Sequence, residues 1–235
     1  MNFSATPGSG SRRQPGRIWR TGWLIGLFAL GEIPVSGPAA PPPVRSPEGR
    51  LENAFAFAAK LAPDFRRVAV LPLAAGTAAG DLPAGCAALT PGLWEQLSKT
   101  RKFEVVAVDG DRLRQATGRA NWTGTETLPP DFLGFLHREY ACDGVLFAEL
   151  TTYRAYAPLA VGWRFKLVDV RSGQIIWAAD ELFDAARPAV LRAAQRFEAP
   201  AAVWPFRQEN WLAVNSPSRF GRYGAATLLD TMPER

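Results

Sequence analysis

The sequence contains little histidine and cysteine, two residue types that many enzymes and metal sites use. Its 235 residues include one histidine, His137, and two cysteines, Cys86 and Cys142. A metal site needs three or four His, Cys or carboxylate ligands, and these three distant residues do not supply them. The chain also lacks the Gly-x-Ser-x-Gly motif of serine hydrolases and the Gly-x-x-x-x-Gly-Lys phosphate-binding loop. The sequence therefore predicts no catalytic residue, no cofactor site and no metal site.

The positive charge of the chain is concentrated at its N-terminus. The whole sequence has a formal net charge of +5 and a pI of about 9.6, but residues 1–50 hold six arginines against two glutamates. The remaining 185 residues carry 21 lysines and arginines against 20 aspartates and glutamates. A nucleic-acid-binding domain keeps its positive charge on the folded surface. The nearly neutral remainder therefore argues against a nucleic-acid partner.

The N-terminal segment has the pattern of an export signal. Four arginines precede the apolar run Gly22–Gly31, and small residues and prolines follow it, as in a secretory signal peptide. The run is about half of the ~20 apolar residues that cross a bilayer as a helix. We predict that residues 1–37 are a signal peptide or a membrane anchor, and that the protein lies in the periplasm or is anchored facing it. Whether the segment is cleaved stays open, and no lipoprotein-type cysteine follows it.

The first half of the remaining sequence predicts buried strands joined by helices. The continuous apolar run Arg67–Leu73 is typical of a strand buried on both faces. Thr90 and Pro91 are typical of an N-cap and a first helical residue, so Ala74–Ala88 is expected to be a loop. The expected elements are a helix over 51–61, a strand over 67–73, a helix over 90–100, a strand over 103–108, a helix over 111–117, a helix capped by Asp131 and a strand over 144–150.

The second half predicts an antiparallel hairpin. Two runs, Trp163–Val170 and Gln174–Leu182, flank a tight turn that contains Gly173. The predicted fold is α/β, with a three-layer-like mixed sheet in the order β-α-β-α-α-β-β-β, in which the early strands are parallel because crossover helices join them. The predicted parts are an extended proline-rich linker at 38–50, the α/β domain at 51–184 and a helical or irregular tail at 185–235 packed on the domain, with helices over 188–198 and from Ser216–Pro217 to about 231.

Three further features have simple structural explanations. Asp109 and Asp111 follow a strand at the end where α/β proteins often hold catalytic groups, but helix capping accounts for an Asp there and is preferred. A single histidine in a helix, His137, is expected to lie on the surface or to be partly buried. The glycine-rich loop Gly76–Gly85 lacks the spacing of a dinucleotide-binding loop, and we expect a plain connection.

Cys86 and Cys142 are compatible with a disulfide, which export would permit, or with free thiols. The predicted topology places them at opposite ends of the sheet, beyond the Cα separation of ~7 Å that a disulfide allows. We therefore expect two free thiols, while the bridge stays open as the alternative.

Four tryptophans form the candidate partner surface. Two of them lie on the predicted hairpin and two in the tail. A tryptophan suits a sheet face that is covered by the tail or by a partner, because its ring is apolar and one edge is polar. Packing within the domain is the alternative. The four residues are Trp163, Trp177, Trp204 and Trp211.

Four motifs occur in the same order as in a known family. The segment Phe165–Ile175, FKLVDVRSGQI, is the most specific of them, and the set covers about residues 66–184. The other three are Arg67–Leu73, Leu97–Val106 and Tyr140–Leu146. Together they resemble the curli assembly/transport (CsgG-type) family, which is related to the N-terminal domain of the Tol propeller protein and to the lipoprotein activators of penicillin-binding proteins.

The resemblance implies a non-enzymatic accessory role in the bacterial cell envelope, through binding or assembly of other envelope proteins. Self-association is also implied, and the first alternative is a subunit of an oligomeric secretion or assembly ring. The second alternative is an enzyme with a site near Asp109 and Asp111. The segments 118–130 and 152–160 are too short for hairpins with membrane-crossing strands of ~9–11 residues, so we expect no pore.

Overall fold

The computed structural model of the chain describes residues 53–77, 81–198 and 215–235. All of them belong to the second of two compact units, which comprises residues 40–235. The predicted segments 1–37 and 38–50 lie outside the described residues, as do Trp204 and Trp211.

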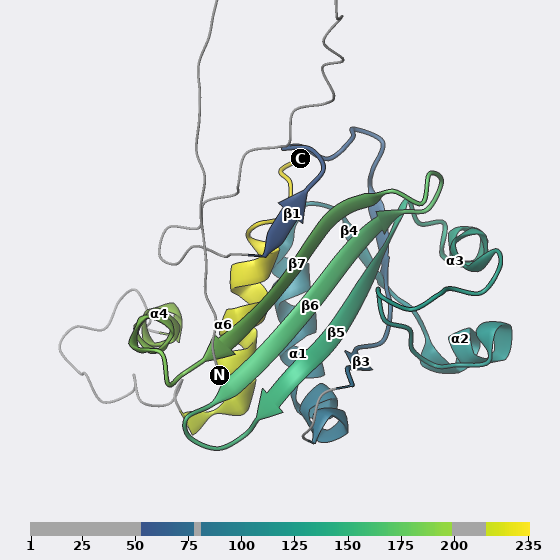
Figure 1. Cartoon of the computed structure of the whole chain (residues 1–235). Coiled ribbons are helices and arrows are strands. Elements are labelled where there is room, and N and C mark those ends of the chain that lie inside the picture. The colour runs from purple at the N-terminus through teal and green to yellow at the C-terminus, as the bar shows by residue number, and fades with distance from the viewer. Residues whose placement is uncertain (1–52, 78–80, 199–214) are drawn as a thin grey trace, which may run out of the picture. The chain divides into compact units, whose positions relative to one another are not determined.

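The described residues form a mixed sheet of seven strands (Figure 1). The strands lie in the order β1-β7-β6-β5-β2-β4, with β3 beside β5. The strand β2 is parallel to both β4 and β5, whereas β5, β6, β7 and β1 are antiparallel neighbours. This confirms the predicted fold class, with parallel early strands and a closing hairpin. The strands are β1 (Ala54–Ala56), β2 (Arg67–Val70), β3 (Ala74–Ala75), β4 (Glu104–Ala107), β5 (Gly144–Arg154), β6 (Ala160–Asp169) and β7 (Ile175–Asp184).

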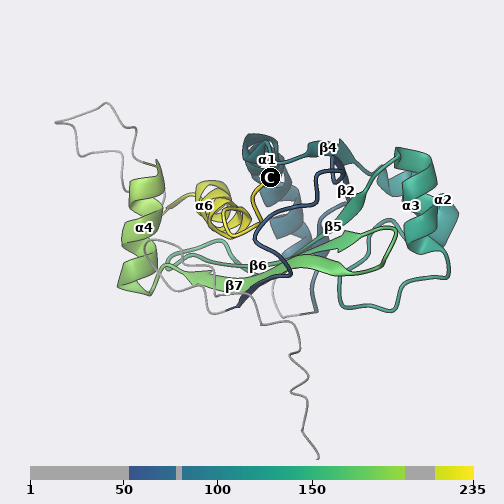
Figure 2. The same ribbon diagram turned by 90° about the horizontal axis from the view of Figure 1, so that it is seen from above.

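Helices cover the two faces of the sheet unequally (Figure 2). On one face, α1 and α6 enclose the larger hydrophobic cluster, with α4 packed beside α6. On the other face, α2 and α3 enclose a smaller cluster over β2 and β5. The helices are α1 (Leu82–Thr100), α2 (Gly110–Thr117), α3 (Phe132–Tyr140), α4 (Pro188–Glu198) and α6 (Pro217–Leu229).

Of two predicted helix caps, the one at Ser216 forms and the one at Asp131 does not. The side chain of Ser216 accepts a hydrogen bond from the backbone of Arg219, so the predicted start of the last helix is confirmed. Asp131 makes no such bond at the start of α3, because its backbone is left-handed, with φ of 58°. Its carboxylate pairs instead with Arg138 on α3.

The segment 51–61, predicted to be a helix, contains the strand β1 instead. Ala54 and Ala56 face the α1 and α6 side and pack against the larger cluster, whereas Phe55 between them is exposed. This alternation has the period of two residues that belongs to a strand. Pairing with β7 therefore overrides the helix propensity of the alanine-rich segment.

The helix α1 begins at Leu82, well before the predicted start at Thr90. Asp81 caps it by accepting a hydrogen bond from a backbone N–H in the first turn. Pro91 lies inside the helix, and prolines there remove one backbone hydrogen bond. A continuous buried face outweighs that loss. Its members are Leu82, Gly85, Leu89, Leu93, Gln96 and Leu97.

Two glycines allow α6 to pack closely on its neighbours. A Cβ atom at Gly221 would lie 2.5 Å from Cδ2 of Leu89 on α1, and one at Gly224 would lie 2.8 Å from Cδ2 of Phe183 on β7. The carbonyl oxygen of Gly221 accepts a hydrogen bond from the indole of Trp163 at 3.0 Å. The small residues therefore set the depth at which α6 lies over the sheet.

We expect Gly221→Ala to lower the free energy of unfolding by about 1–3 kcal/mol because the added methyl overpacks the contact with α1. The matched change Gly92→Ala on α1 meets atoms no closer than 3.6 Å and should stabilise by about 0.5–1 kcal/mol, the ordinary gain of alanine over glycine in a helix. Urea unfolding measures both. Equal effects of the two changes would contradict the close packing of α6.

Candidate functional site

The tryptophans of the hairpin do not form a partner surface. Trp163 and Trp177 are fully buried on the face of β6 and β7 that α6 covers. Their indole N–H groups donate to the carbonyl of Gly221 and to the hydroxyl of Thr231, each at 3.0 Å, and Phe165 stacks between the two rings. The predicted partner surface is therefore wrong for these two residues, because the C-terminal helix already buries them.

The polar residues that the sequence marks as candidates are engaged in local contacts. The carboxylate of Asp109 accepts hydrogen bonds from the backbone of Arg112 and Asp111, which lower its pKa, and this confirms the predicted cap of α2. His137 lies with Nδ1 at 2.7 Å from the carbonyl oxygen of Cys142. In the part of the chain that the structure describes, no three His, Cys, Asp or Glu side chains gather as metal ligands. None of the described helices has the length and apolar character needed to span a bilayer.

The two cysteines are free thiols on opposite faces of the sheet. Cys142 is buried in the cluster under α2 and α3, whereas Cys86 packs on α1 against the larger cluster. Burial raises the pKa of Cys86 to about 11 and also raises the pKa of Cys142. The sheet itself separates the two sulfur atoms, which explains the absence of a bridge better than the predicted separation along the strands.

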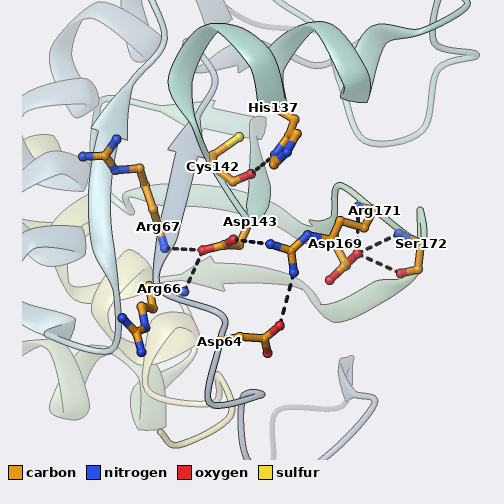
Figure 3. A network of polar contacts seen from close by, with 9 residues as sticks. All are labelled: Asp64, Arg66, Arg67, His137, Cys142, Asp143, Asp169, Arg171 and Ser172. Atoms are coloured by element: carbon orange, nitrogen blue, oxygen red, sulfur yellow. Dashed lines mark hydrogen bonds and ion pairs between the residues drawn. The ribbon is translucent and has the colours of Figure 1, made fainter.

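A group of hydrogen bonds joins the beginnings of β2 and β5 to the turn between β6 and β7 (Figure 3). The carboxylate of Asp143 accepts hydrogen bonds from the backbone N–H groups of Arg66 and Arg67, at 2.9 and 3.1 Å, and from the guanidinium of Arg171 at 3.2 Å. Asp169 accepts from the backbone and hydroxyl of Ser172, and Gly173 adopts a φ of +70° that favours glycine. These motif residues therefore shape the sheet and its turn.

The antiparallel half of the sheet has one face that no described helix covers. In Figure 1 this face points toward the viewer, with α1 and α6 behind the strands. Phe55 and Leu182 are 46% and 42% exposed on it. At its border, Lys166 donates a hydrogen bond to the carbonyl of Gly124, which lies in the loop before α3. We call this surface the open face, and it consists of Phe55, Glu149, Arg164, Lys166, Ala178, Asp180 and Leu182.

Arg164 joins two carboxylates across three strands of the open face. Its Nε donates to Asp180 on β7 at 2.7 Å, and its Nη1 donates to both oxygens of Glu149 on β5 at 3.2 and 3.3 Å. Burial acts to lower the pKa of the guanidinium, but Asp180 and Glu149 raise it above its ordinary value. Glu149 is only 5% exposed, so this ion pair is the means by which a buried carboxylate is neutralised.

A hollow with a volume of about 360 Å³ lies on the open face over Ala178. In the register of the sheet, Ala178 is flanked by Phe55 on β1 and by Lys166 on β6. The single methyl between two long side chains leaves the space empty. Arg164, Asp180 and Asn53 also line the hollow.

Comparison with solved structures finds loose likenesses. PelC from Paraburkholderia phytofirmans, solved as a dodecamer, is 17% identical over 75% of this chain and 93% of that chain, with a TM-score of 0.43. Lipoprotein GNA1162 from Neisseria meningitidis is 20% identical over 51% and 82%, with a TM-score of 0.39. The C-terminal domain of LpoB from Salmonella enterica is 19% identical over 50% and 82%, with a TM-score of 0.32. These values assign no activity or partner to this chain.

Neither a protein-family model nor a curated protein sequence matches the chain. The resemblance to the curli assembly/transport family therefore stays a prediction.

The residues of the open face are not among the site residues that the sequence predicts. Arg164 and Lys166 alternate with apolar residues in the run that predicted the hairpin, and this alternation was the available signal. Phe55 gives no signal because the alanine-rich segment around it predicts a helix. Ala178 gave none because an alanine becomes the floor of a hollow only through its neighbours on other strands.

Replacing Arg164 with methionine should lower the free energy of unfolding by about 1–3 kcal/mol, because Glu149 then stays buried without a partner. The double change Arg164→Met with Glu149→Gln should recover part of that loss, and urea unfolding measures both. The matched change Arg114→Met removes an exposed ion pair on α2 and should have little effect. A double variant less stable than the single one would contradict the role of Arg164 as the partner of a buried charge.

Native Cys86 should react with iodoacetamide about 100-fold more slowly than an unfolded thiol at neutral pH, because its pKa of about 11, against the ordinary 9.0, leaves a smaller thiolate population. The rate should keep rising with pH until it approaches that pKa. Mass spectrometry after labelling in concentrated guanidinium chloride should find two modified thiols. Two unmodified cysteines in the unfolded, unreduced chain would reveal a disulfide and contradict the structure.

Proposed function

We propose that this chain is an exported accessory protein of the cell envelope that binds other proteins through the open face and catalyses no reaction. The observation that carries the proposal is the unequal cover of the sheet. Helices α2 and α3 cover only the parallel half of one face, and the antiparallel half keeps two large apolar side chains exposed beside a hollow. Exposed apolar side chains that lie among charged ones, as on this face, are found in protein–protein interfaces.

The contacts that hold the strands of the open face together support a binding role. The strands β5, β6 and β7 are 10 or 11 residues long, and α6 packs firmly behind them. Arg164 fixes three strands against one another on the open side. A surface that is ordered before binding loses less conformational entropy when a partner docks.

We expect a partner to contact the open face and not to add a strand to the edge of the sheet at the end of β7. The guanidinium of Arg187 donates to the carbonyl of Leu182 and lies 3.7 Å from the carboxylate of Glu181. A charged side chain at a strand edge discourages pairing with another strand. A partner is therefore expected to meet side chains of the open face.

The proposed location rests on the N-terminal sequence. Residues 1–37 have the pattern of an export signal or anchor, and the proline-rich residues 38–50 would span up to about 40 Å if extended at about 3.1 Å per residue. If the segment is retained, the linker keeps the domain within reach of the membrane and of other envelope proteins.

A photo-crosslinking amino acid in place of Leu182 should form an adduct with a specific protein in cells that naturally produce the chain. The same amino acid in place of Arg114, which is exposed on α2, is the matched control and should form none. Denaturing gels and mass spectrometry measure the adducts. Adducts from both positions, or from the control alone, would overturn the open face as the binding surface. An adduct between two copies would favour the oligomeric ring instead.

A further inference from the structure

The hollow over Ala178 has a shape that suits one inserted side chain. Its floor is a methyl group, and one wall is the phenyl ring of Phe55, which is 46% exposed. Its volume of about 360 Å³ is near the lower end of the range for ligand sites, roughly 300–1,000 Å³. Aromatic rings pair favourably edge to face or offset, and aromatic anchors in pockets dominate many protein interfaces. An aromatic side chain is therefore the occupant that this wall and floor favour.

The two cationic side chains around the hollow differ in whether a carboxylate neutralises them. Arg164 is engaged by the carboxylates of Asp180 and Glu149, so its positive charge is already neutralised and that end of the hollow carries one negative charge in excess. Lys166 forms no ion pair with any carboxylate in the described ranges, and its ammonium donates only to the carbonyl of Gly124. An ammonium group has three donors. The rim of the hollow therefore offers one cation to an incoming carboxylate.

From this shape and charge we propose that the open face binds a partner segment that places an aromatic side chain over Ala178 and an Asp or Glu beside Lys166. The inference rests on the proposed function and adds to it the chemistry of the partner. A segment with a basic residue in place of the acidic one would bring two cations together, and the site would reject it.

Selection from a phage-displayed library of random dodecapeptides tests the proposal on the immobilised full-length chain. Enriched peptides should share an aromatic residue and an acidic residue at a fixed spacing. A synthetic peptide of that consensus should bind Ala178→Arg at least about tenfold more weakly, because the new side chain fills the hollow. It should bind Lys166→Glu at least about tenfold more weakly as well, because the charge is reversed.

The charge reversal also provides a gain of function. Selection on Lys166→Glu should enrich peptides in which Lys or Arg replaces the acidic residue, which a merely structural role of Lys166 would not produce. Arg114→Glu on α2 is the matched control and should leave binding of the consensus peptide unchanged. Urea unfolding should confirm that each variant is folded, and Ala178→Trp is a second variant that fills the hollow without a charge.

Each other outcome overturns the inference. Peptides without the aromatic and acidic pair, or with affinity unaffected by filling the hollow, would refute it. If their binding is weakened by Leu182→Arg, the open face remains the binding surface and only the partner chemistry is wrong. If no peptide is enriched and the crosslinker at Leu182 forms no adduct, both the inference and the proposed function fail.

Discussion

Two tryptophans on β6 and β7 require a hydrophobic cover, and α6 supplies it. Trp163 and Trp177 are fully buried, and each indole N–H finds an acceptor on α6 or in the turn that follows it. The contact depends on Gly221 and Gly224, which let the helix approach. Because α6 occupies that face, the other face of the antiparallel strands is the one left for solvent or a partner. The position of α6 therefore determines both which side chains are buried in the core and which face of the strands stays accessible.

Local signals predicted the elements that depend on local chemistry. The turn with Asp169, Ser172 and Gly173 fixes the hairpin through hydrogen bonds among neighbours, and Asp109 caps α2 within three residues. The two wrong elements depend on distant partners. The segment 51–61 contains a strand because β7 offers it an edge, and α1 runs through Pro91 because α6 and the sheet bury its leucine face. Such contacts lie beyond a local sequence window.

The candidate site shows the same division between local and distant information. The alternation in the run from Trp163 to Val170 separates the two faces of β6 correctly, with Arg164 and Lys166 opposite Trp163 and Phe165. What the alternation cannot tell is which face is covered, because the cover is the helix α6, whose Gly221 lies 58 residues beyond Trp163. The tryptophans were therefore a sound signal for a covered face, and the polar residues between them marked the one that stays open.

The register of the sheet connects the fold to the binding chemistry. Side chains on a strand alternate between the two faces, so a shift of one residue moves every side chain to the opposite face. A shift of β7 against β6 would expose Trp177 and carry Ala178 into the core beneath α6. The hollow and its lysine therefore exist only in the register that buries the tryptophans. A partner that contacts both Ala178 and Lys166 would therefore bind only the correctly paired hairpin, and it would not recognise a chain whose strands had paired out of register.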